Sequence, residues 1–273
     1  MLWFQKGLSV LPVVLICWSC GTLVLTYTVS VLLGHTDLLL PYISDTGTEV
    51  PERCVFGFML CISAFLGLCT VYVRYKQVQA LISASESSLQ TLNYLGFLLG
   101  VISSIGMCVV ASFQKTDMMS MHLFGAGMTF GPGALYILVQ TGVSYRMQPR
   151  FHGTGILWAR SAVGVWCLLS IIVLFVSSML MYDEVPGQDV ATKLRWAPGE
   201  RGYLPHLVSA GAEWSLAFSF ICFFFTFIRD FQKISLRVQP ILQSNHLYSY
   251  PLYDEREHHH HHGERSPLLG GNI

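Results

Sequence analysis

Residues 8–34 read LSVLPVVLICWSCGTLVLTYTVSVLLG and contain no Asp, Glu, Lys or Arg. The stretch is longer than the roughly 20 apolar residues that an α-helix needs to cross the hydrocarbon core of a bilayer. A cleavable secretory signal has a shorter apolar run and a cleavage site of small residues after it, and this stretch shows neither feature. It therefore predicts a first transmembrane helix that stays in the protein as a signal anchor.

Five further stretches have the same composition, and only the last of them contains a charged residue, Glu213. In lipid the backbone must satisfy its own hydrogen bonds, so each stretch is expected to be an α-helix. The sequence thus predicts an all-α, polytopic membrane protein. We expect residues 1–238 to form one bundle of six transmembrane helices, at about 9–34, 55–73, 90–112, 119–141, 161–182 and 204–228.

The overall composition agrees with this class and excludes several others. Hydrophobic residues make up 52% of the 273 residues and charged residues 12%, whereas a soluble domain has about 25% charged residues. The formal net charge is zero, so nothing indicates a nucleic-acid partner. Cys17 and Cys20 have a spacing that can bind metal, but a pair buried in hydrocarbon more often packs as small apolar side chains. We expect no cofactor and no metal site.

The distribution of basic residues predicts the orientation. Eleven of the 16 Lys and Arg residues fall in the N-terminus, the C-terminal tail and the loops after the second and fourth spans, and five fall in the other loops. Arg74 and Arg160 are counted as loop residues in this comparison. The positive-inside rule therefore places both termini in the cytosol, and the remaining loops in the lumen or outside the cell.

The tetrapeptide Asp45-Thr46-Gly47-Thr48 matches the signature of aspartic proteases. Those enzymes need two carboxylates that share a proton, each held in a β-rich lobe. Here a single copy lies in a loop of about twenty residues between two spans, which leaves no room for such lobes. Intramembrane aspartyl proteases need aspartates within the spans, and these six spans contain none.

The same loop is better explained as an ordered turn. Ser44, Asp45, Thr46 and Gly47 are turn-forming residues, because their side chains bond to nearby backbone and the glycine permits positive φ. Pro51 and Glu52 suit the first turn of the second helix. We expect a structured lumenal turn, and this interpretation predicts that Asn can replace Asp45.

Five blocks of sequence resemble the damage-regulated autophagy modulator (DRAM) family, in the family's order and over residues 1–238: PYISDTGT (41–48), YVRYKQV (72–78), VASFQKT (110–116), AEWS (212–215) and FIRDFQKISLRV (227–238). Ser112 stands where the family is expected to have Asn, and the tail after Val238 departs from the family's pattern. The resemblance implies a six-span protein of lysosomal and other endomembranes. It also implies that the protein promotes autophagy, is linked to cell death and has no known catalytic chemistry.

Glu213 is the one carboxylate within a span, and ionisable groups in a membrane are costly and often functional. His206 lies seven residues earlier on the same helical face, roughly 10 Å away at 1.5 Å per residue, too far for direct contact. One interpretation is a proton-linked gate or transport site. The alternative, which we favour, is a hydrogen-bonded glutamate that fixes helix packing.

The segment after the sixth span contains Arg229, Lys233 and Arg237, which recur at every fourth residue. A helix that continued through them would place all three on one face. Three basic residues near an anionic leaflet attract it weakly, at about 1 kcal/mol each. Positive-inside anchoring explains them at least as well as a phosphoinositide contact does.

The tail, residues 239–273, is polar, has no periodic pattern and is expected to be a disordered cytosolic segment. It contains His258–His262, a run that we assign no function because it resembles either a weak metal-binding tract or an expression tag. Glu264, Leu268 and Leu269 fit the acidic dileucine pattern that clathrin adaptors bind. Exposed leucines in such a tail need an explanation, and adaptor capture supplies one.

Two classes of function follow. The first is a non-enzymatic regulator of autophagy in lysosomal or endosomal membranes, which acts through lipids, clathrin adaptors and other membrane proteins. The second is a proton-linked or small-solute transporter that uses Glu213. The two differ in what Glu213 does, because the regulator needs it only for folding and the transporter needs its charge.

Overall fold

The computed structural model describes residues 7–83 and 85–235. The predicted tail, residues 239–273, lies outside this part of the chain. The described helices are α1 (Val10–Leu32), the 3-10 turn η2 (Asp45–Gly47), α2 (Glu52–Leu81), α3 (Ser87–Ser112), α4 (Lys115–Arg146), α5 (Thr154–Glu184), α6 (Tyr203–Phe225) and α7 (Phe227–Phe231).

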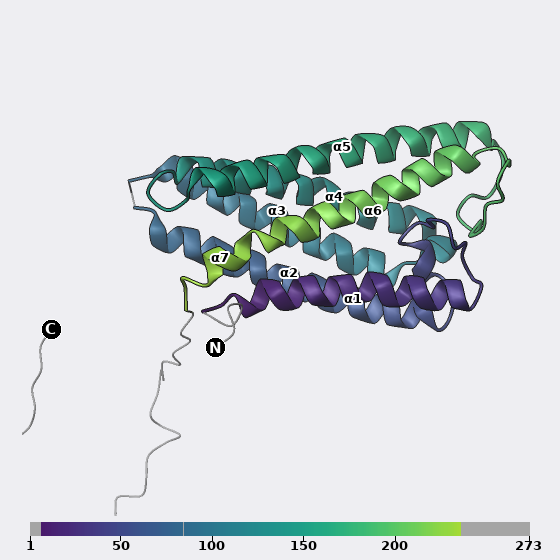
Figure 1. The fold of residues 1–273 in the computed structure, drawn as a ribbon, viewed down its shortest axis with the longest axis horizontal. Coiled ribbons are helices and arrows are strands. Elements are labelled where there is room, and N and C mark those ends of the chain that lie inside the picture. The colour runs from purple at the N-terminus through teal and green to yellow at the C-terminus, as the bar shows by residue number, and fades with distance from the viewer. Residues whose placement is uncertain (1–6, 84, 236–273) are drawn as a thin grey trace, which may run out of the picture. The chain divides into compact units, whose positions relative to one another are not determined.

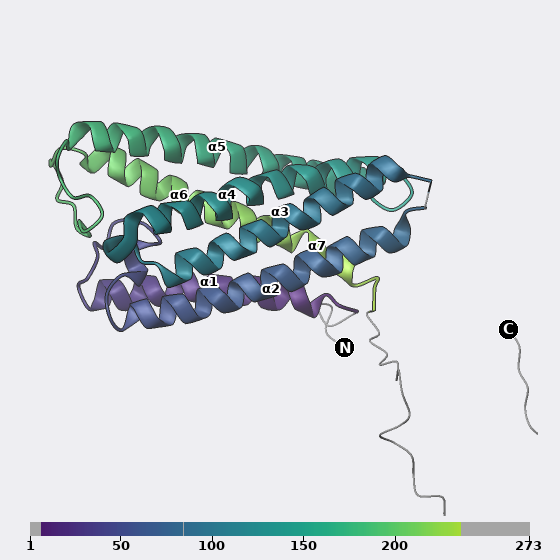
Figure 2. The same cartoon turned by 180° about the vertical axis from the view of Figure 1, so that it is seen from behind.

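The six long helices form a closed ring in chain order. Each packs against the next one along the chain, and α6 returns to pack against α1. One side of the ring shows α1, α5 and α6, and the opposite side shows α2, α3 and α4 (Figures 1 and 2). Short connections join α2 to α3, α3 to α4 and α4 to α5, and consecutive antiparallel helices joined in this way become neighbours.

Large apolar side chains cover the outside of the ring. On α5, Leu169, Ile172 and Phe175 are each more than half exposed, which water would disfavour and lipid tails accept. All six long helices are long and apolar enough to cross a membrane, when the continuation of α6 through α7 is included. The predicted all-α fold with six membrane-spanning helices is thereby confirmed, and the orientation of the termini stays a prediction.

Several helices run beyond the predicted spans, which changes the environment of two arginines. α2 continues past Val73 to Leu81, and α5 begins at Thr154, before the predicted start at 161. Arg74 and Arg160 therefore lie inside helices and are fully buried. The prediction that they lie in loops was wrong. Both side chains can be buried because the partners described below compensate their charge.

The two ends of the described bundle meet. The backbone N–H of Leu8 donates to the carbonyl oxygens of Phe231 and Ile234, at 3.0 and 3.2 Å. Gly7 adopts φ +58°, and a Cβ there would come within 2.6 Å of the Ile234 carbonyl oxygen. Only glycine fits this left-handed, closely approached position. The start of α1 is thus fastened to the end of α7.

Candidate functional site

The turn at residues 45–47 is buried at one end of the bundle, which we call the Asp45 end. Thr46 donates through its hydroxyl to the Ile43 carbonyl oxygen at 2.7 Å, and its Oγ1 lies 3.2 Å from that of Thr26 on α1. Gly47 packs against the Phe56 ring of α2, where a Cβ would come within 2.3 Å of the ring. The structure thus places the predicted turn residues in a 3-10 turn that is fixed between α1 and α2.

Asp45 forms a buried ion pair with Lys115, the first residue of α4. The two residues are 1% and 6% exposed. Burial raises the pKa of the Asp45 carboxyl, and the Lys115 ammonium opposes that rise. Asn in place of Asp45 would leave a buried ammonium without a counter-charge. The pair therefore removes the basis for the expectation that Asn can replace Asp45.

Lys115 also lies over the ring of Tyr42, with Nζ 5.6 Å from the ring centroid. The Tyr42 hydroxyl is hydrogen-bonded to Ser209 of α6. Burial raises the pKa of Tyr42 to about 12, so the phenol stays protonated and able to donate. The 41–48 loop is thus held by α4 and α6 as well as by the turn itself.

Glu213 of α6 holds the backbone of the same loop. Its Oε2 accepts a hydrogen bond from the Ile43 N–H at 2.7 Å, and the neighbouring Trp214 donates through Nε1 to the Pro41 carbonyl oxygen at 2.8 Å. These two bonds satisfy loop groups that would otherwise be buried without partners. The second interpretation of Glu213, as a packing residue, is the one that these contacts support.

Glu213 also lines a cavity of about 170 Å³ inside the ring, together with His122 of α4. The His122 Nδ1 lies 2.8 Å from the Phe113 carbonyl oxygen, so the neutral ring presents Nε2 as an acceptor. Most of the other lining residues are apolar. His206 does not line this cavity and instead stacks on Trp196, with ring centroids 4.6 Å apart.

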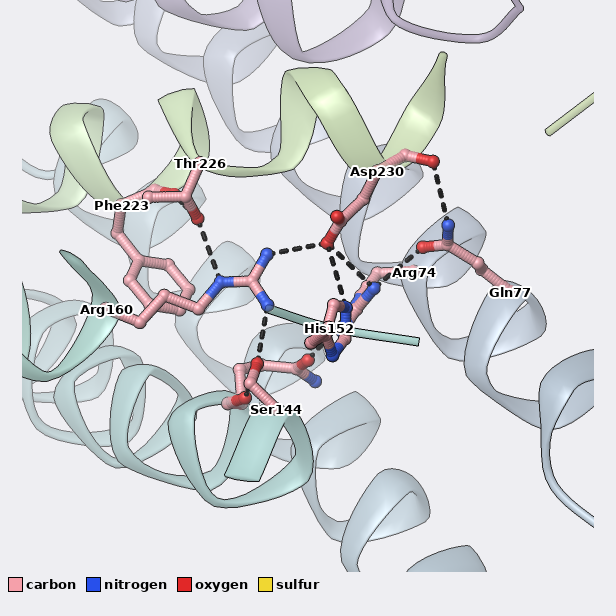
Figure 3. A network of polar contacts seen from close by, with 9 residues as sticks. Arg74, Gln77, Ser144, His152, Arg160, Phe223, Thr226 and Asp230 are labelled. Atoms are coloured by element: carbon pink, nitrogen blue, oxygen red, sulfur yellow. Dashed lines mark hydrogen bonds and ion pairs between the residues drawn. The ribbon is translucent and has the colours of Figure 1, made fainter. Parts of the chain in front are cut away.

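The opposite end of the bundle, the Asp230 end, contains a buried network of polar contacts (Figure 3). Oδ2 of Asp230, on α7, accepts from Nη1 of Arg74 at 3.2 Å and from Nη2 of Arg160 at 2.7 Å. His152 approaches the same oxygen with Nε2 at 3.4 Å. One carboxylate oxygen therefore holds α2, α5 and the α4–α5 connection around α7.

Neighbouring side chains accept four further hydrogen bonds from the two guanidinium groups. Arg74 donates to the Oε1 atoms of Gln77 and Gln140, at 2.8 and 3.1 Å. Arg160 donates to the hydroxyls of Ser144 and Thr226, at 2.5 and 3.0 Å. Figure 3 shows these side chains pointing into the space between the helices. Charge-assisted bonds of this kind are about twice as strong as neutral ones.

The Phe227 ring lies against both guanidinium groups. The Cζ atoms of Arg74 and Arg160 are 5.3 and 4.9 Å from its centroid, within the range of a cation–π contact. The ring face thus attracts two guanidinium groups that carry the same charge. Its burial explains why an aromatic residue precedes Asp230 by one helical turn.

The predicted basic face is only partly described. Arg229 lies on α7, but this helix ends at Phe231, so Lys233 does not follow on the same helix. Arg237 lies outside the described residues. The continuous helical face that would join the three is therefore not formed within the described part. Glu264, Leu268 and Leu269 also lie outside the described residues.

Sequence analysis missed the charged partners Lys115, Arg74, Arg160 and Asp230. A usable signal was present, because Arg74 lies between Val73 and Tyr75, and Asp230 belongs to an Arg-Asp pair enclosed by apolar residues in FIRDF. A charge in such surroundings is expected to be buried and paired. The sequence does not say which charge pairs with which.

Comparisons with known proteins give the family. The family described as "Frag1/DRAM/Sfk1/Cwh43P N-terminal domain" matches residues 7–234. "DNA damage-regulated autophagy modulator protein 2" of Homo sapiens is 47% identical over 273 residues, all of both chains. "DNA damage-regulated autophagy modulator protein 1" of Homo sapiens is 39% identical over 87% of this chain and 97% of its own length.

A more distant relative, "Modulator of macroautophagy TMEM150B-A" of Xenopus laevis, is 31% identical over 62% of this chain and 72% of its own length. No solved structure matches the chain. The resemblance noted from the five sequence blocks is confirmed over the whole bundle. The chain belongs to the Frag1/DRAM/Sfk1/Cwh43P family, in which it is similar along its full length to DNA damage-regulated autophagy modulator protein 2.

Proposed function

We propose that the chain is a multi-pass regulator of autophagy in lysosomal or endosomal membranes, linked to cell death and without catalytic chemistry of its own. The observation that carries the proposal is 47% identity to a named autophagy modulator over the full length of both chains. The structure supports a scaffold role, because its buried charges connect helices to one another. Partner proteins and membrane lipids then supply the contacts through which it acts.

Autophagic flux tests this proposal. In cells that lack the chain, lysosomal turnover of a reporter cargo should fall, and the wild-type chain should restore it. A variant that keeps the fold but lacks residues 236–273 separates the bundle from the tail. Unchanged flux in the deletion cells, with the wild-type chain located on lysosomes, would count against a regulatory role.

Transport is the second candidate, favoured by the position of Glu213 on the intramembrane cavity. A carboxyl group facing such a cavity could exchange a proton with a solute. Glu213→Gln keeps an acceptor for the Ile43 N–H and removes the proton exchange. If transport is the function, purified Glu213→Gln in sealed vesicles should lose proton or solute flux at normal abundance. If regulation is the function, its autophagy output should be retained.

Sorting to lysosomes is proposed to depend on Glu264, Leu268 and Leu269, captured by clathrin adaptors. The double variant Leu268→Ala/Leu269→Ala should move protein from lysosomes to the plasma membrane without changing its folding. A phosphomimetic at Ser266 should move it less, because it adds charge beside Glu264. Wild-type colocalisation and unchanged surface biotinylation in the double variant would remove this part of the proposal.

The proposed orientation and the lipid contact can be tested together. A reporter fused to the C-terminus should be accessible from the cytosol, and one inserted after Glu49 should be lumenal. Replacing Arg229, Lys233 and Arg237 by Gln should weaken attraction to phosphoinositide vesicles by about 1 kcal/mol per residue. Protection of the C-terminal reporter in sealed vesicles would reverse the orientation.

A further inference from the structure

A hollow at the Asp230 end lies where the chain passes from α4 to α5. Its volume is about 510 Å³, and its lining includes Arg146, Gln148, His152 and Thr154. It is distinct from the cavity that Glu213 lines. None of its lining residues is acidic. The hollow therefore combines space with basic and polar side chains.

The N-terminus of α5 forms one wall of the hollow. The helix is 31 residues long and follows Gly153, which has an extended backbone and no side chain to cap the helix. The first N–H groups of a helix have no partner within it and carry a partial positive charge. Such a terminus attracts anions. Whether this terminus binds an anion therefore depends on the side chains around it.

Two of those side chains have buried nitrogen atoms without a partner in the described part of the chain. His152 is 6% exposed, and its Nε2 faces Asp230. Its Nδ1 has no hydrogen-bond partner, and neither has Nε2 of Gln148. Buried polar groups without partners are costly. The amide can donate as it stands, and the imidazole can donate from Nδ1 when it is protonated.

The charges behind the hollow also lack balance. Two buried guanidinium groups, of Arg74 and Arg160, share the single carboxylate of Asp230, which leaves one positive charge in excess. Arg74 Nη2 has no hydrogen-bond partner among the described residues. Arg146 adds a further positive charge on the lining, near the exposed rim. The network thus has more donors than acceptors.

We propose that this hollow binds a phosphate group, presented by a phosphorylated lipid headgroup or free in solution. Phosphate supplies several acceptor oxygens and negative charge, which Arg146, Gln148 and the α5 N-terminus can bind. The expected orientation places the hollow at the cytosolic face. The proposal goes beyond the regulatory function and does not involve Arg229, Lys233 or Arg237.

Binding can be measured on the purified full chain in phosphatidylcholine nanodiscs. The probes are inorganic phosphate and a short-chain phosphatidylinositol phosphate, each compared with chloride at matched ionic strength. Arg146→Gln and Gln148→Leu should each weaken binding about tenfold, as expected for the loss of one charge-assisted or one buried hydrogen bond. Lys76→Gln is the matched control, because it removes an exposed positive charge that does not line the hollow, and it should bind as wild type.

Gly153→Asp gives a sharper test because its two expected effects have opposite signs. A Cβ at Gly153 meets nothing within 4 Å, and an aspartate there can cap the helix itself. The variant should unfold at a higher temperature and bind phosphate at least tenfold more weakly, because its carboxylate occupies the position of the anion and repels the anion. Gly153→Asn caps without charge, and should bind more tightly than Gly153→Asp.

The outcomes separate the sources of the ligand. Binding of inorganic phosphate and the lipid alike identifies the phosphate group itself as the ligand, and binding of the lipid alone identifies a headgroup. The proposal is overturned if neither probe binds, or if Gly153→Asp and Arg146→Gln bind as wild type. These results are independent of autophagic flux, so the proposed function stands or falls separately.

Discussion

The Asp45 end and the Asp230 end solve the problem of burying charge in two different ways. At the Asp45 end the Asp45 carboxylate meets one ammonium, that of Lys115, so the formal charges of this pair cancel. At the Asp230 end one carboxylate meets two guanidinium groups, so they do not. Glu52 at the Asp45 end and Arg74 at the Asp230 end are about 33 Å apart along α2, at 1.5 Å per residue. The two ends therefore lie near opposite membrane surfaces.

The two ends therefore differ in how the buried charges are balanced. The Asp45 pair fastens a loop whose other contacts are made by α1, α2 and α6, and the two charges of the pair balance each other. The Asp230 network has guanidinium, amide and imidazole atoms that the described residues leave without partners. A buried excess of donors is tolerated only with compensation from water, backbone or an anion.

The largest expected effect comes from Asp230→Leu. It leaves two fully buried guanidinium groups without a carboxylate, and breaking a buried ion pair in this way costs about 3–5 kcal/mol. Thermal unfolding of the purified protein should show a large loss of stability and of yield. Glu200→Gln is the control, because the Lys193–Glu200 pair is more exposed and should hardly matter. Equal stability of the two variants would contradict the central role of Asp230.

Lys115→Met should cost several kcal/mol at neutral pH, since it leaves the Asp45 carboxylate buried alone. The loss should shrink as the pH falls. Burial raises the pKa of Asp45 above that of the unfolded chain, so the folded state binds the proton more readily and gains stability as the pH falls through the folded pKa. Melting temperatures at neutral and acidic pH measure this change.

The double variant Asp45→Asn/Lys115→Met is the control for that prediction, because it removes both charges and should recover much of the loss without a pH dependence. A deficit in Lys115→Met that is the same at both pH values would show that Asp45 does not carry the unpaired charge.

Gly47→Ala tests how tightly the Asp45 loop is packed. The new Cβ would overlap the Phe56 ring, and overpacking of this kind costs about 1–3 kcal/mol. Gly127→Ala is the matched control on α4, where a Cβ meets nothing within 4 Å. A melting temperature that falls for the first and not for the second supports tight closure. Equal effects would show that the loop can move away from α2.

Glu213→Gln is expected to have the smallest effect on stability, because the amide oxygen can still accept from the Ile43 N–H. Glu213→Leu removes that acceptor and should cost about 1–3 kcal/mol. The difference in melting temperature between the two variants measures the loop bond alone. Should Gln destabilise as much as Leu, the carboxylate charge rather than the hydrogen bond would be what the fold needs.

The sequence alone allowed the six helices to be predicted, because charge-free stretches of sufficient length have one solution in lipid. It also allowed a turn at 44–47 to be predicted, since turn chemistry is local. The ion pairs were beyond it. Two helices lie between Asp45 and Lys115 in the chain, and four lie between Arg74 and Asp230. A single sequence carries no record of which helices adjoin. The burial of Arg74 and Arg160 was likewise hidden, because helix length beyond the apolar run is set by tertiary packing.

The bond from Leu8 to the end of α7 has a consequence for how the protein is attached to its surroundings. Because the first and last described residues leave the bundle beside each other, the N-terminal segment and the C-terminal tail share one point of attachment. Two ligands bound by these segments would be held at a high effective concentration relative to each other, as in a bivalent tether. A pull on either segment would load the same hydrogen bonds at Phe231 and Ile234.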